Sequence, residues 1–299
     1  MLLKMVKIRG TIIDETYAEA FRMRYTRLVV TAHDAYWLSA AVAAVTGYGA
    51  SVIGCDAEVG VEQYLADTAT PDGRPGAAIL AFAFSTEAVA KAIANRTGQC
   101  LMTCPTTAVY DGLPEAPERV PLGKRIRYFG DGFQKSKQLD GRRFWRVPVM
   151  DGEFLVEESV GVAKGIAGGN IIVQAARLEA ALAAARRGCD AIADLRGVIT
   201  PFPGGVARSG SKVGSRYKGL VGSTADAYCP TLRGRVTTQL HEGVSCAYEI
   251  VIDGVDQETV ARAMGVAIQA AVGDEVVAIA AGNYGGKLGK FHFRLHDLL

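Results

Sequence analysis

The fold is decided by a stretch that reads NIIVQAARLEAALAAARRGCDAIADLRGVIT (170–200). Its opening run, NIIVQA, is apolar and has the length of a buried strand. Apolar residues then recur at the i, i+3, i+4, i+7 spacing of one helix face, namely at Leu178, Ala181, Leu182 and Ala185. The run GVIT (197–200) predicts a further strand, so the stretch forms a strand–helix–strand unit.

The same order of elements continues toward the carboxyl end. A long glycine-rich segment is followed by SCAYEIVI (245–252), which predicts a strand. The last run, VVAIAA (276–281), predicts another strand. Between these two strands we expect a helix whose apolar face consists of Val260, Ala263, Met264, Ala267 and Ala271.

The amino-terminal half repeats this order. RLVVTA (27–32) predicts a strand, and the helix after it carries Leu38, Ala41, Val42 and Val45 on one face. Thr31 and Asp34 fit an S/T-x-x-D capping signal at the start of that helix. The remaining elements expected in this half are a strand over 50–54, the apolar run 77–84, a helix over 86–97 and a strand over 99–104.

Strand–helix–strand twice in each half is the split βαβ pattern of ferredoxin-like domains. The sequence therefore predicts an α+β fold made by duplication of two ferredoxin-like lobes, residues 1–147 and 148–299. Turn signals between aromatic and β-branched runs predict an inserted region of β-hairpins over 125–159. Each sheet would bury one face under two helices and leave the other face for a partner.

The composition indicates a globular protein without a strongly charged surface. The 299 residues include 33 Lys and Arg against 31 Asp and Glu, and a net charge of +2 favours neither nucleic acid nor an acidic membrane. Hydrophobic residues make up 49%, which excludes intrinsic disorder. No apolar run approaches the roughly 20 residues that span a bilayer, and the start, MLLKMVKIRG, lacks a signal-peptide core. The expected location is the cytoplasm.

Two glycine-rich loops are candidates for ligand contact, PFPGGVARSGSKVGS (201–215) and AGNYGGKLGK (281–290). Backbone N–H groups of such loops can surround an anionic or carbonyl oxygen, and tight turns alone are the alternative. Neither loop fits a Walker A motif or a Rossmann fingerprint. The candidate substrate-binding residues are Phe202, Pro203, Gly204, Gly205, Arg208, Ser209, Lys212, Asn283 and Lys287.

The other reactive side chains give weak signals. His292 and His296 share one parity on a predicted terminal strand and would face the same side, but a third metal ligand is missing, so we expect no metal site. Cys104, before Pro105, is a candidate nucleophile, although a small buried residue at a strand end explains it equally well. Only Cys100 and Cys104 lie close together, and the six cysteines are expected to be buried, reduced thiols.

Glu249 lies in the middle of the predicted strand SCAYEIVI, on the face that also carries Ala247 and Val251. A glutamate between apolar neighbours is rarely tolerated unless it is paired, bound to a ligand or protonated. Burial would raise its pKa and make it a candidate proton donor near neutral pH. The alternative is an ion pair with an arginine such as Arg208 or Arg216.

Several distinctive strings follow one another along the chain: GQCLMTCPTTAVYD, YFGDGFQ, PFPGG, SKVGS, DAYCPT, CAYEIVIDG, AGNYGGKLG and the terminal HDLL. Together they resemble the formylmethanofuran:tetrahydromethanopterin formyltransferase family, and the resemblance extends from about Gly10 to Leu299. It implies two ferredoxin-like lobes and a homo-oligomer, a dimer or a tetramer.

The resemblance also implies an activity, the reversible transfer of a formyl group between the amine of a methanofuran-type carrier and N5 of tetrahydromethanopterin. The two carriers would be co-substrates in a ternary complex, without a metal or a tightly bound cofactor. In the family, the glutamate of the AYEIV-type strand lies beside the reacting formyl group, which makes Glu249 the candidate catalytic residue. We assign Lys212, Arg208 and Lys287 to the anionic groups of the carriers from charge and loop context.

The charge balance indicates which kind of family member this is. Archaeal members are strongly acidic, whereas this chain has a net charge of +2 and an Ala- and Arg-rich stretch, AALAAARRG (180–188). We infer a bacterial, methylotroph-type member that works in the oxidation of formaldehyde-derived units to formate. A formate-releasing hydrolase is then an expected partner.

Two other functions compete with formyl transfer. The first is a catalytically silent subunit that binds the pterin or scaffolds a formyltransferase/hydrolase complex, and the intact Glu249 and PFPGG argue against it. The second is a metal-dependent hydrolase, which lacks its ligand set.

Overall fold

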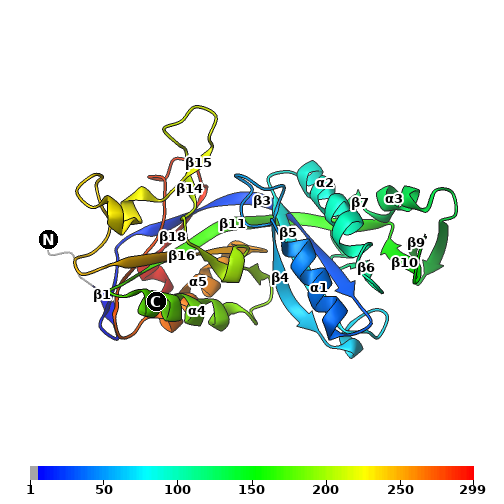
Figure 1. The fold of residues 1–299 in the computed structure, drawn as a ribbon, viewed down its shortest axis with the longest axis horizontal. Helices are drawn as coiled ribbons and strands as arrows, with labels where there is room; N and C mark the ends of the chain where they lie inside the picture. The colour runs from blue at the N-terminus through cyan, green and yellow to red at the C-terminus, as the bar shows by residue number, and fades with distance from the viewer. Residues whose placement is uncertain (1–5) are drawn as a thin grey trace. The chain divides into compact units, whose positions relative to one another are not determined.

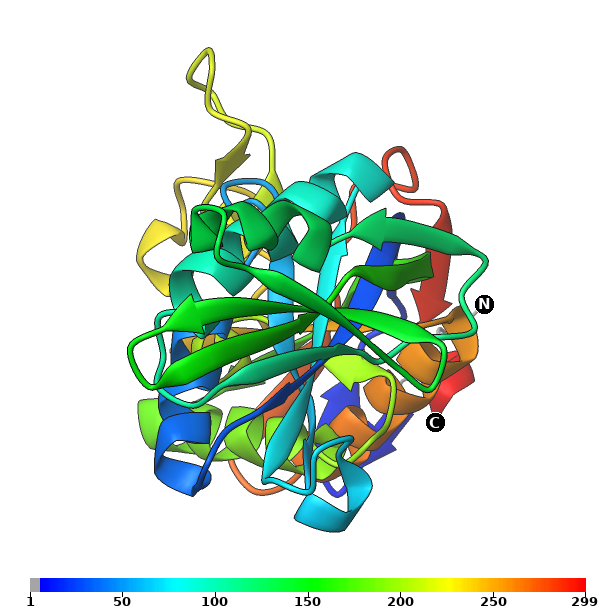
Figure 2. The same ribbon diagram turned by 90° about the vertical axis from the view of Figure 1, so that its right-hand side faces the viewer.

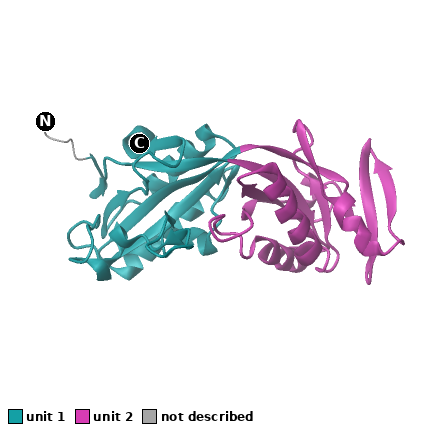
Figure 3. Cartoon of the chain, turned by 90° about the horizontal axis from the view of Figure 1, so that it is seen from above, with its two compact units in different colours: residues 1–22, 165–299 teal, residues 23–164 magenta. Residues whose placement is uncertain are grey.

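The computed structural model describes residues 6–299, which form a mixed α+β fold in two compact units (Figure 3). Unit 1 comprises residues 6–22 and 165–299, and unit 2 comprises residues 23–164. The chain passes between the units within two long strands, β3 (Tyr17–Thr31) and β11 (Ser159–Ala175). The predicted boundary between residues 147 and 148 falls within a strand of unit 2, β9 (Arg142–Val149).

Unit 1 contains the helices α4 (Leu178–Ile192) and α5 (Gln257–Ala271) and several short 3-10 turns. Its strands, besides parts of β3 and β11, are β1 (Val6–Ile8), β2 (Thr11–Ile13), β12 (Val198–Ile199), β13 (Val206–Ala207), β14 (Lys212–Val213), β15 (Gly222–Ser223), β16 (Cys246–Gly254), β17 (Val276–Ala280) and β18 (Phe291–Arg294). In the sheet, β17, β11, β16 and β12 follow one another, each antiparallel to the next. β2 extends this sheet beside β17, and β18 pairs with the first residues of β3.

The helices α4 and α5 pack against one face of the unit 1 sheet (Figure 1). Ile171 of β11 and Ile250 of β16 pair across the sheet and are fully buried in the apolar core beneath the helices. Because side chains alternate along a strand, Asn170, Ile172 and Glu249 point to the opposite face. This alternation separates the core face of the sheet from the face that carries the polar residues.

Unit 2 has the helices α1 (Ala35–Thr46), α2 (Thr86–Arg96) and α3 (Gly123–Ile126). Its further strands are β4 (Glu58–Leu65), β5 (Gly76–Ala83), β6 (Ala108–Asp111), β7 (Glu118–Pro121), β8 (Lys135–Leu139), β9 and β10 (Gly152–Glu157). The strands β6, β3, β5 and β4 follow one another, again all antiparallel, and α1 and α2 contribute side chains to the core beneath them. The green hairpin strands β8, β9 and β10 lie toward the viewer in Figure 2.

Most of the elements predicted from apolar spacing are present, including all four long helices and the strands at 77–84, 245–252 and 276–281. The hairpins predicted within 125–159 are confirmed for residues 135–157, whereas residues 123–130 are helical. The strand predicted over 50–54 is wrong, because these residues form turns before β4. The strand predicted over 99–104 is also wrong, because a π-helical turn, η2 (Thr97–Leu101), continues α2.

Two local details of the helices differ from the sequence expectation. Asp34 alone caps α1, since its carboxylate accepts the backbone N–H groups of Tyr36 and Trp37, whereas Thr31 ends β3. In α4 the buried face passes through Ala181 and Ala185, and Leu178 is half exposed. No helix among residues 6–299 has the length and apolar character that a membrane crossing requires.

Candidate active site

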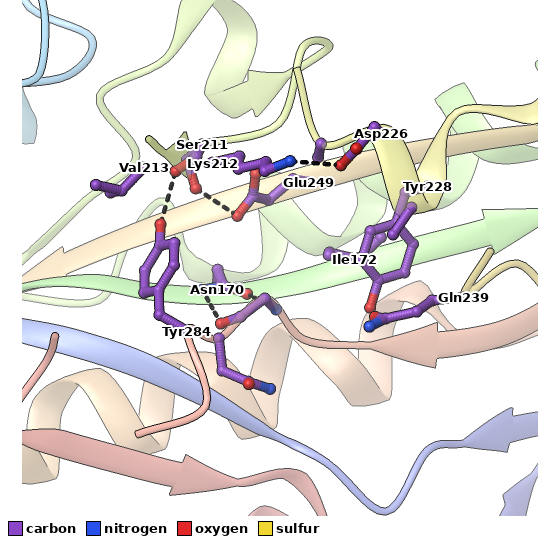
Figure 4. Close-up of a pocket in the computed structure, with 14 residues that line it drawn as sticks. Asn170, Ile172, Ser211, Lys212, Val213, Asp226, Tyr228, Gln239, Glu249 and Tyr284 are labelled. Atoms are coloured by element: carbon purple, nitrogen blue, oxygen red, sulfur yellow. Dashed lines mark hydrogen bonds and ion pairs between the residues drawn. The ribbon is translucent and has the colours of Figure 1, made fainter. Parts of the chain in front are cut away.

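A cavity of about 210 Å³ lies on the polar-residue face of the unit 1 sheet (Figure 4). Its floor carries Asn170 and Ile172 of β11 and Glu249 of β16, and Ile172 and Glu249 are direct neighbours across the sheet. The other lining residues come from loops that cover the floor, and they are Ser211, Lys212, Val213, Ala225, Asp226, Ala227, Tyr228, Gln239, Gly282, Asn283 and Tyr284.

Glu249 is the buried acid of this cavity, with 5% of its surface exposed. The Ser211 hydroxyl group donates a hydrogen bond to Oε1 of Glu249 over 2.7 Å. Burial raises the pKa of Glu249, and the hydroxyl and backbone N–H of Ser211 partly offset this effect, which leaves the pKa at about 6. The carboxyl group can therefore give and take a proton near neutral pH.

The sequence left open whether Glu249 is a structural ion-pair partner. Within residues 6–299, no Lys, Arg or His side chain forms an ion pair with it. The shift of its pKa comes from burial and from Ser211, and not from Arg208 or Arg216. The described surroundings of Glu249 are therefore those of a desolvated acid and not those of a salt bridge.

Tyr284 connects the second glycine-rich loop to Ser211. Its hydroxyl group donates to the Ser211 carbonyl oxygen over 2.7 Å (Figure 4). Burial raises the pKa of Tyr284 to about 12, so the hydroxyl group stays protonated and remains a donor. Asn170 holds the same loop from below, because its Oδ1 accepts the Gly282 N–H over 2.6 Å and its Nδ2 donates to the Gly282 carbonyl oxygen.

The loop of residues 281–290 folds around a carboxylate of the protein itself. Glu19, on β3, is 1% exposed. Its Oε2 accepts the N–H groups of Tyr284 and Gly286, both over 2.8 Å, and its Oε1 accepts those of Leu288 and Gly289 over 2.6 and 2.5 Å. Burial acts to raise the pKa of Glu19, but the four N–H groups outweigh it and lower the pKa.

This arrangement corrects the expectation that the loop would surround a ligand oxygen. The loop does form a nest of backbone N–H groups, but the carboxylate of Glu19 and not a ligand occupies it. The glycines serve this close approach, because a Cβ atom on Gly289 would lie 2.5 Å from the Ala20 carbonyl oxygen. The loop is thus a fixed wall of the cavity.

The other glycine-rich segment begins with the turn η4 (Pro203–Gly205), in which the Gly205 N–H donates to the Phe202 carbonyl oxygen over 2.7 Å. Gly204 and Gly205 have φ angles of +62° and +79°. None of residues 202–205 lines the cavity beside Glu249. Their assignment to substrate binding remains a prediction, and the structure shows a tight turn here.

The two glycines of this turn give a matched pair of variants. A Cβ atom on Gly205 would lie 2.6 Å from Cys189 Sγ and 2.9 Å from Thr200 Oγ1, whereas one on Gly204 would meet nothing within 4 Å. We expect Gly204→Ala to cost about 1–2 kcal/mol of unfolding free energy from its left-handed backbone, and Gly205→Ala about 1–3 kcal/mol more from overpacking. Urea unfolding measures both, and equal losses in the two variants would contradict the packing argument.

Four of the five remaining candidate binding residues line one of two hollows. Lys212 and Asn283 line the cavity described above, and Lys212 Nζ lies 2.7 Å from Asp226 Oδ1. The hydrogen bond from Lys212 lowers the pKa of Asp226. Arg208 and Ser209 line a smaller hollow that also reaches Glu249. Lys287 is exposed and lines neither hollow.

The weak signals from histidine and cysteine do not lead to a second site. The predicted terminal strand ends at Arg294, so His292 lies on β18 and His296 on a 3-10 turn, where its Nε2 lies 2.8 Å from the Ile13 carbonyl oxygen. The shared face predicted for the two histidines is therefore wrong. No three His, Cys, Asp or Glu side chains of residues 6–299 gather as a metal-binding group would require.

Burial raises the pKa of the Cys104 thiol, which disfavours the thiolate that a nucleophile needs. All six cysteines are free and partly exposed in the structure, so the expected full burial is wrong.

Several residues of the cavity were not predicted from the sequence. Ser211 lies within the SKVGS string but was not singled out, and neither Tyr284 nor Asn170 carries a signal of its own. Glu19 does carry one, because YAEAF places a single carboxylate among apolar and aromatic residues, as CAYEIV does for Glu249.

A desolvated carboxyl group with a pKa near 6, held by a hydroxyl group at the edge of a cavity, is the arrangement of a general acid–base site, and the class of protein it defines is an enzyme. The chain belongs to the formylmethanofuran–tetrahydromethanopterin formyltransferase family. The family model of that name matches residues 6–149, and a second model, described as the proximal lobe, matches residues 152–298.

Relatives and solved structures cover nearly the whole chain. The chain is 50% identical to the formylmethanofuran–tetrahydromethanopterin formyltransferase of Methylococcus capsulatus, over 98% of this chain and 99% of the relative. A structure of the formyltransferase from Methanosarcina barkeri is similar with a TM-score of 0.92 and 43% identity, over 98% of this chain and 100% of that one. The formyltransferase/hydrolase complex of Methylorubrum extorquens, determined with methylofuran, contains a chain with a TM-score of 0.94 and 44% identity, over 99% of both chains.

Proposed function

We propose that this protein transfers a formyl group reversibly between N5 of tetrahydromethanopterin and the amine of a methanofuran-type carrier. The observation that carries the proposal is Glu249, a buried acid that faces a cavity and lies in the strand CAYEIVI. The resemblance to the family implies that this strand position lies beside the reacting formyl group. The relatives named above carry the same activity in their names.

Transfer between two nitrogens requires one proton to be moved. The attacking amine forms a bond to the formyl carbon, the bond between that carbon and the leaving nitrogen breaks, and one proton passes from the attacking to the leaving nitrogen. Glu249 in its acid form donates a hydrogen bond to the formyl oxygen as negative charge develops there. It then gives its proton to the leaving nitrogen and regains one from the attacking nitrogen.

The oxygen that becomes negatively charged needs a donor, and the described loops restrict which donor is available. Glu19 already accepts the N–H groups of Tyr284, Gly286, Leu288 and Gly289, and Asn170 accepts that of Gly282. We therefore assign the oxyanion to the acid form of Glu249. Lys212 and Asn283 in the cavity, and Arg208 and Ser209 in the adjoining hollow, are proposed contacts of the carriers.

Formyl transfer should decline as the pH rises through the pKa of the acid. Because the acid form of Glu249 is the active one and its pKa is about 6, kcat/KM should be level below about pH 6 and fall about tenfold per pH unit above it. A pH series of initial rates measures this limb in the direction in which N5 of the pterin attacks, because the primary amine of the furan carrier would add its own titration if it were the attacking nitrogen. A profile that instead rises through pH 6 would assign Glu249 the role of a base.

The proposed function is tested by incubating the purified protein with formyl-tetrahydromethanopterin and a methanofuran and following formyl exchange in both directions. Exchange in both directions is expected. The competing function, a silent pterin-binding or scaffolding subunit, predicts that the protein binds the pterin without any exchange, and that result would overturn formyl transfer.

We infer that the two units are duplicated ferredoxin-like lobes, and the support is that each unit pairs its four main strands in the same antiparallel order. We also infer an oligomer with hydrolase subunits, since the solved relative from Methylorubrum extorquens is a formyltransferase/hydrolase complex. The cytoplasmic location, the flow of formyl groups toward the furan carrier and the role in formaldehyde oxidation are proposed on the same grounds as the activity.

A further inference from the structure

We propose that Ser211 is a positioning residue of this site: it aims the carboxyl group of Glu249 so that the proton faces the cavity, and Tyr284 in turn holds Ser211 in place. The proposal rests on the proposed function, because it concerns the same proton. It goes beyond that function by naming two residues whose proposed effect on the reaction acts through Glu249.

Ser211 supplies the only donors that residues 6–299 direct at the Glu249 side chain. Its Oγ donates to Oε1 over 2.7 Å, and its backbone N–H also stabilises the charged form. An oxygen that already accepts a hydroxyl proton is the less favourable position for the acid proton, so neutral Glu249 carries its proton on Oε2. The hydroxyl group thereby fixes both the rotation of the carboxyl group and the oxygen that donates.

The position of Ser211 is fixed by its neighbours on both sides. Gly210 precedes it with a φ of +71°, and a Cβ atom there would lie only 2.3 Å from the Ala225 Cβ, so the chain passes this point closely. The Ser211 carbonyl oxygen accepts the hydroxyl proton of Tyr284 over 2.7 Å. Tyr284 belongs to the loop that Glu19 holds through four N–H groups. Ser211 is therefore hydrogen-bonded to a loop that is itself held in place.

A pH readout can be attributed to Glu249 only if its titratable neighbours are known. The titratable and charged groups that line the two hollows beside Glu249 are Tyr228, Tyr284, Lys212, Asp226, Arg208, Tyr248 and Cys229. Burial raises the pKa of each of the three tyrosines, and Asp226 is paired with Lys212 and has a lowered pKa, so these groups do not change charge near pH 6. Arginine stays charged throughout. The variant Cys229→Ala tests whether Cys229 contributes to the pH profile.

The decisive variant is Ser211→Ala, studied with Ser211→Thr, which restores a hydroxyl group. Loss of the hydroxyl bond removes a contact that favours the charged form, so the pKa of Glu249 should rise by about 1 unit. The alkaline limb of the kcat/KM profile should move to higher pH by the same amount, and kcat on the acid plateau should fall roughly tenfold because the proton is no longer aimed. Ser211→Thr should return both quantities toward the wild type, and Cys229→Ala should keep the wild-type limb.

A second readout does not depend on turnover. In protein labelled with ¹³C at glutamate side-chain carboxyls, the resonance that disappears in Glu249→Gln belongs to Glu249, and its titration can be followed in Ser211→Ala and Tyr284→Phe. We expect an upward shift in both variants, the smaller one in Tyr284→Phe. An unchanged titration with folded protein would overturn the role of Ser211, or that of Tyr284 alone if only its variant is unchanged. Absence of formyl exchange in the wild type would instead overturn the proposed function, whatever the titration shows.

Discussion

Replacement of Glu249 by glutamine should lower kcat of formyl transfer by roughly 10²–10⁴-fold and leave the affinity for both carriers close to that of the wild type. Glutamine keeps the shape of the side chain, and its Oε1 can still accept the hydroxyl bond from Ser211. The amide has no proton to give to a leaving nitrogen. Initial rates at pH 6, with each carrier varied in turn, separate kcat from KM.

The same variant should not be less stable, and this distinguishes an acid from an ion-pair partner. The folded-state pKa of Glu249, about 6, lies above the ordinary value of 4.5, so the wild type loses stability as the pH rises from about 4.5 to 6. The shift corresponds to about 2 kcal/mol, which the variant does not lose. At pH 7–8 Glu249→Gln should therefore be up to about 2 kcal/mol more stable than the wild type, as measured by urea unfolding.

An ion-pair role predicts the opposite stability change. Removal of one partner of a buried pair costs about 3–5 kcal/mol because the other charge is left unpaired. A Glu249→Gln protein with a lowered unfolding free energy and near-normal kcat would thus overturn the catalytic assignment. Glu258→Gln, at the exposed start of α5, is the matched control and should change neither quantity by much.

The face of the sheet on which Glu249 lies could be predicted because a strand alternates strictly between its two sides. A single charged residue in SCAYEIVI was enough to mark a buried acid, and β16 places it as the pattern requires. The long helices followed from apolar spacing in the same way. The pattern could not predict the loop residues that cover the cavity. Ser211, Tyr284 and Gly282 come from irregular loops, which have no periodicity.

The wrong strand at 50–54 shows how buried charges mislead a reading by apolar runs. The true strand, β4, contains Glu58 and Glu62 and therefore offers no uninterrupted apolar run. Both side chains are buried, and Glu62 accepts two hydrogen bonds from the Arg27 guanidinium group, at 2.5 and 2.6 Å. A charge whose partner lies on another strand is tolerated in a core, and the partner is invisible in the local sequence.

Glu19 is the extreme case of such a long-range partner, since the amides it binds lie 265–270 residues later in the chain. We expect Glu19→Gln to destabilise the protein by roughly 3–5 kcal/mol. One amide oxygen can replace Oε1, but the amide NH₂ group would then face the N–H groups of Tyr284 and Gly286, and each buried donor left without an acceptor costs about 1–3 kcal/mol. Urea unfolding at pH 7 measures the loss.

The pH dependence of stability gives the same carboxylate a second signature. The folded-state pKa of Glu19 lies below its ordinary value of 4.5, so its contribution to stability is fully present above about pH 4.5 and is lost as the pH falls through the folded-state pKa. The wild type should therefore lose stability on acidification below pH 4.5, and Glu19→Gln should lose less over the same range. Parallel curves for the two proteins would contradict the lowered pKa.

A general loss of stability could have many causes, so the effect has to be located in the loop. In Glu19→Gln, hydrogen exchange should speed up at the amides of Tyr284, Gly286, Leu288 and Gly289, whereas the exposed Glu15→Gln should leave them protected. Because Tyr284 braces Ser211 against Glu249, kcat should fall in the same variant even under conditions where the protein is folded. If these amides stay protected and kcat is unchanged, the wall of the cavity does not depend on Glu19.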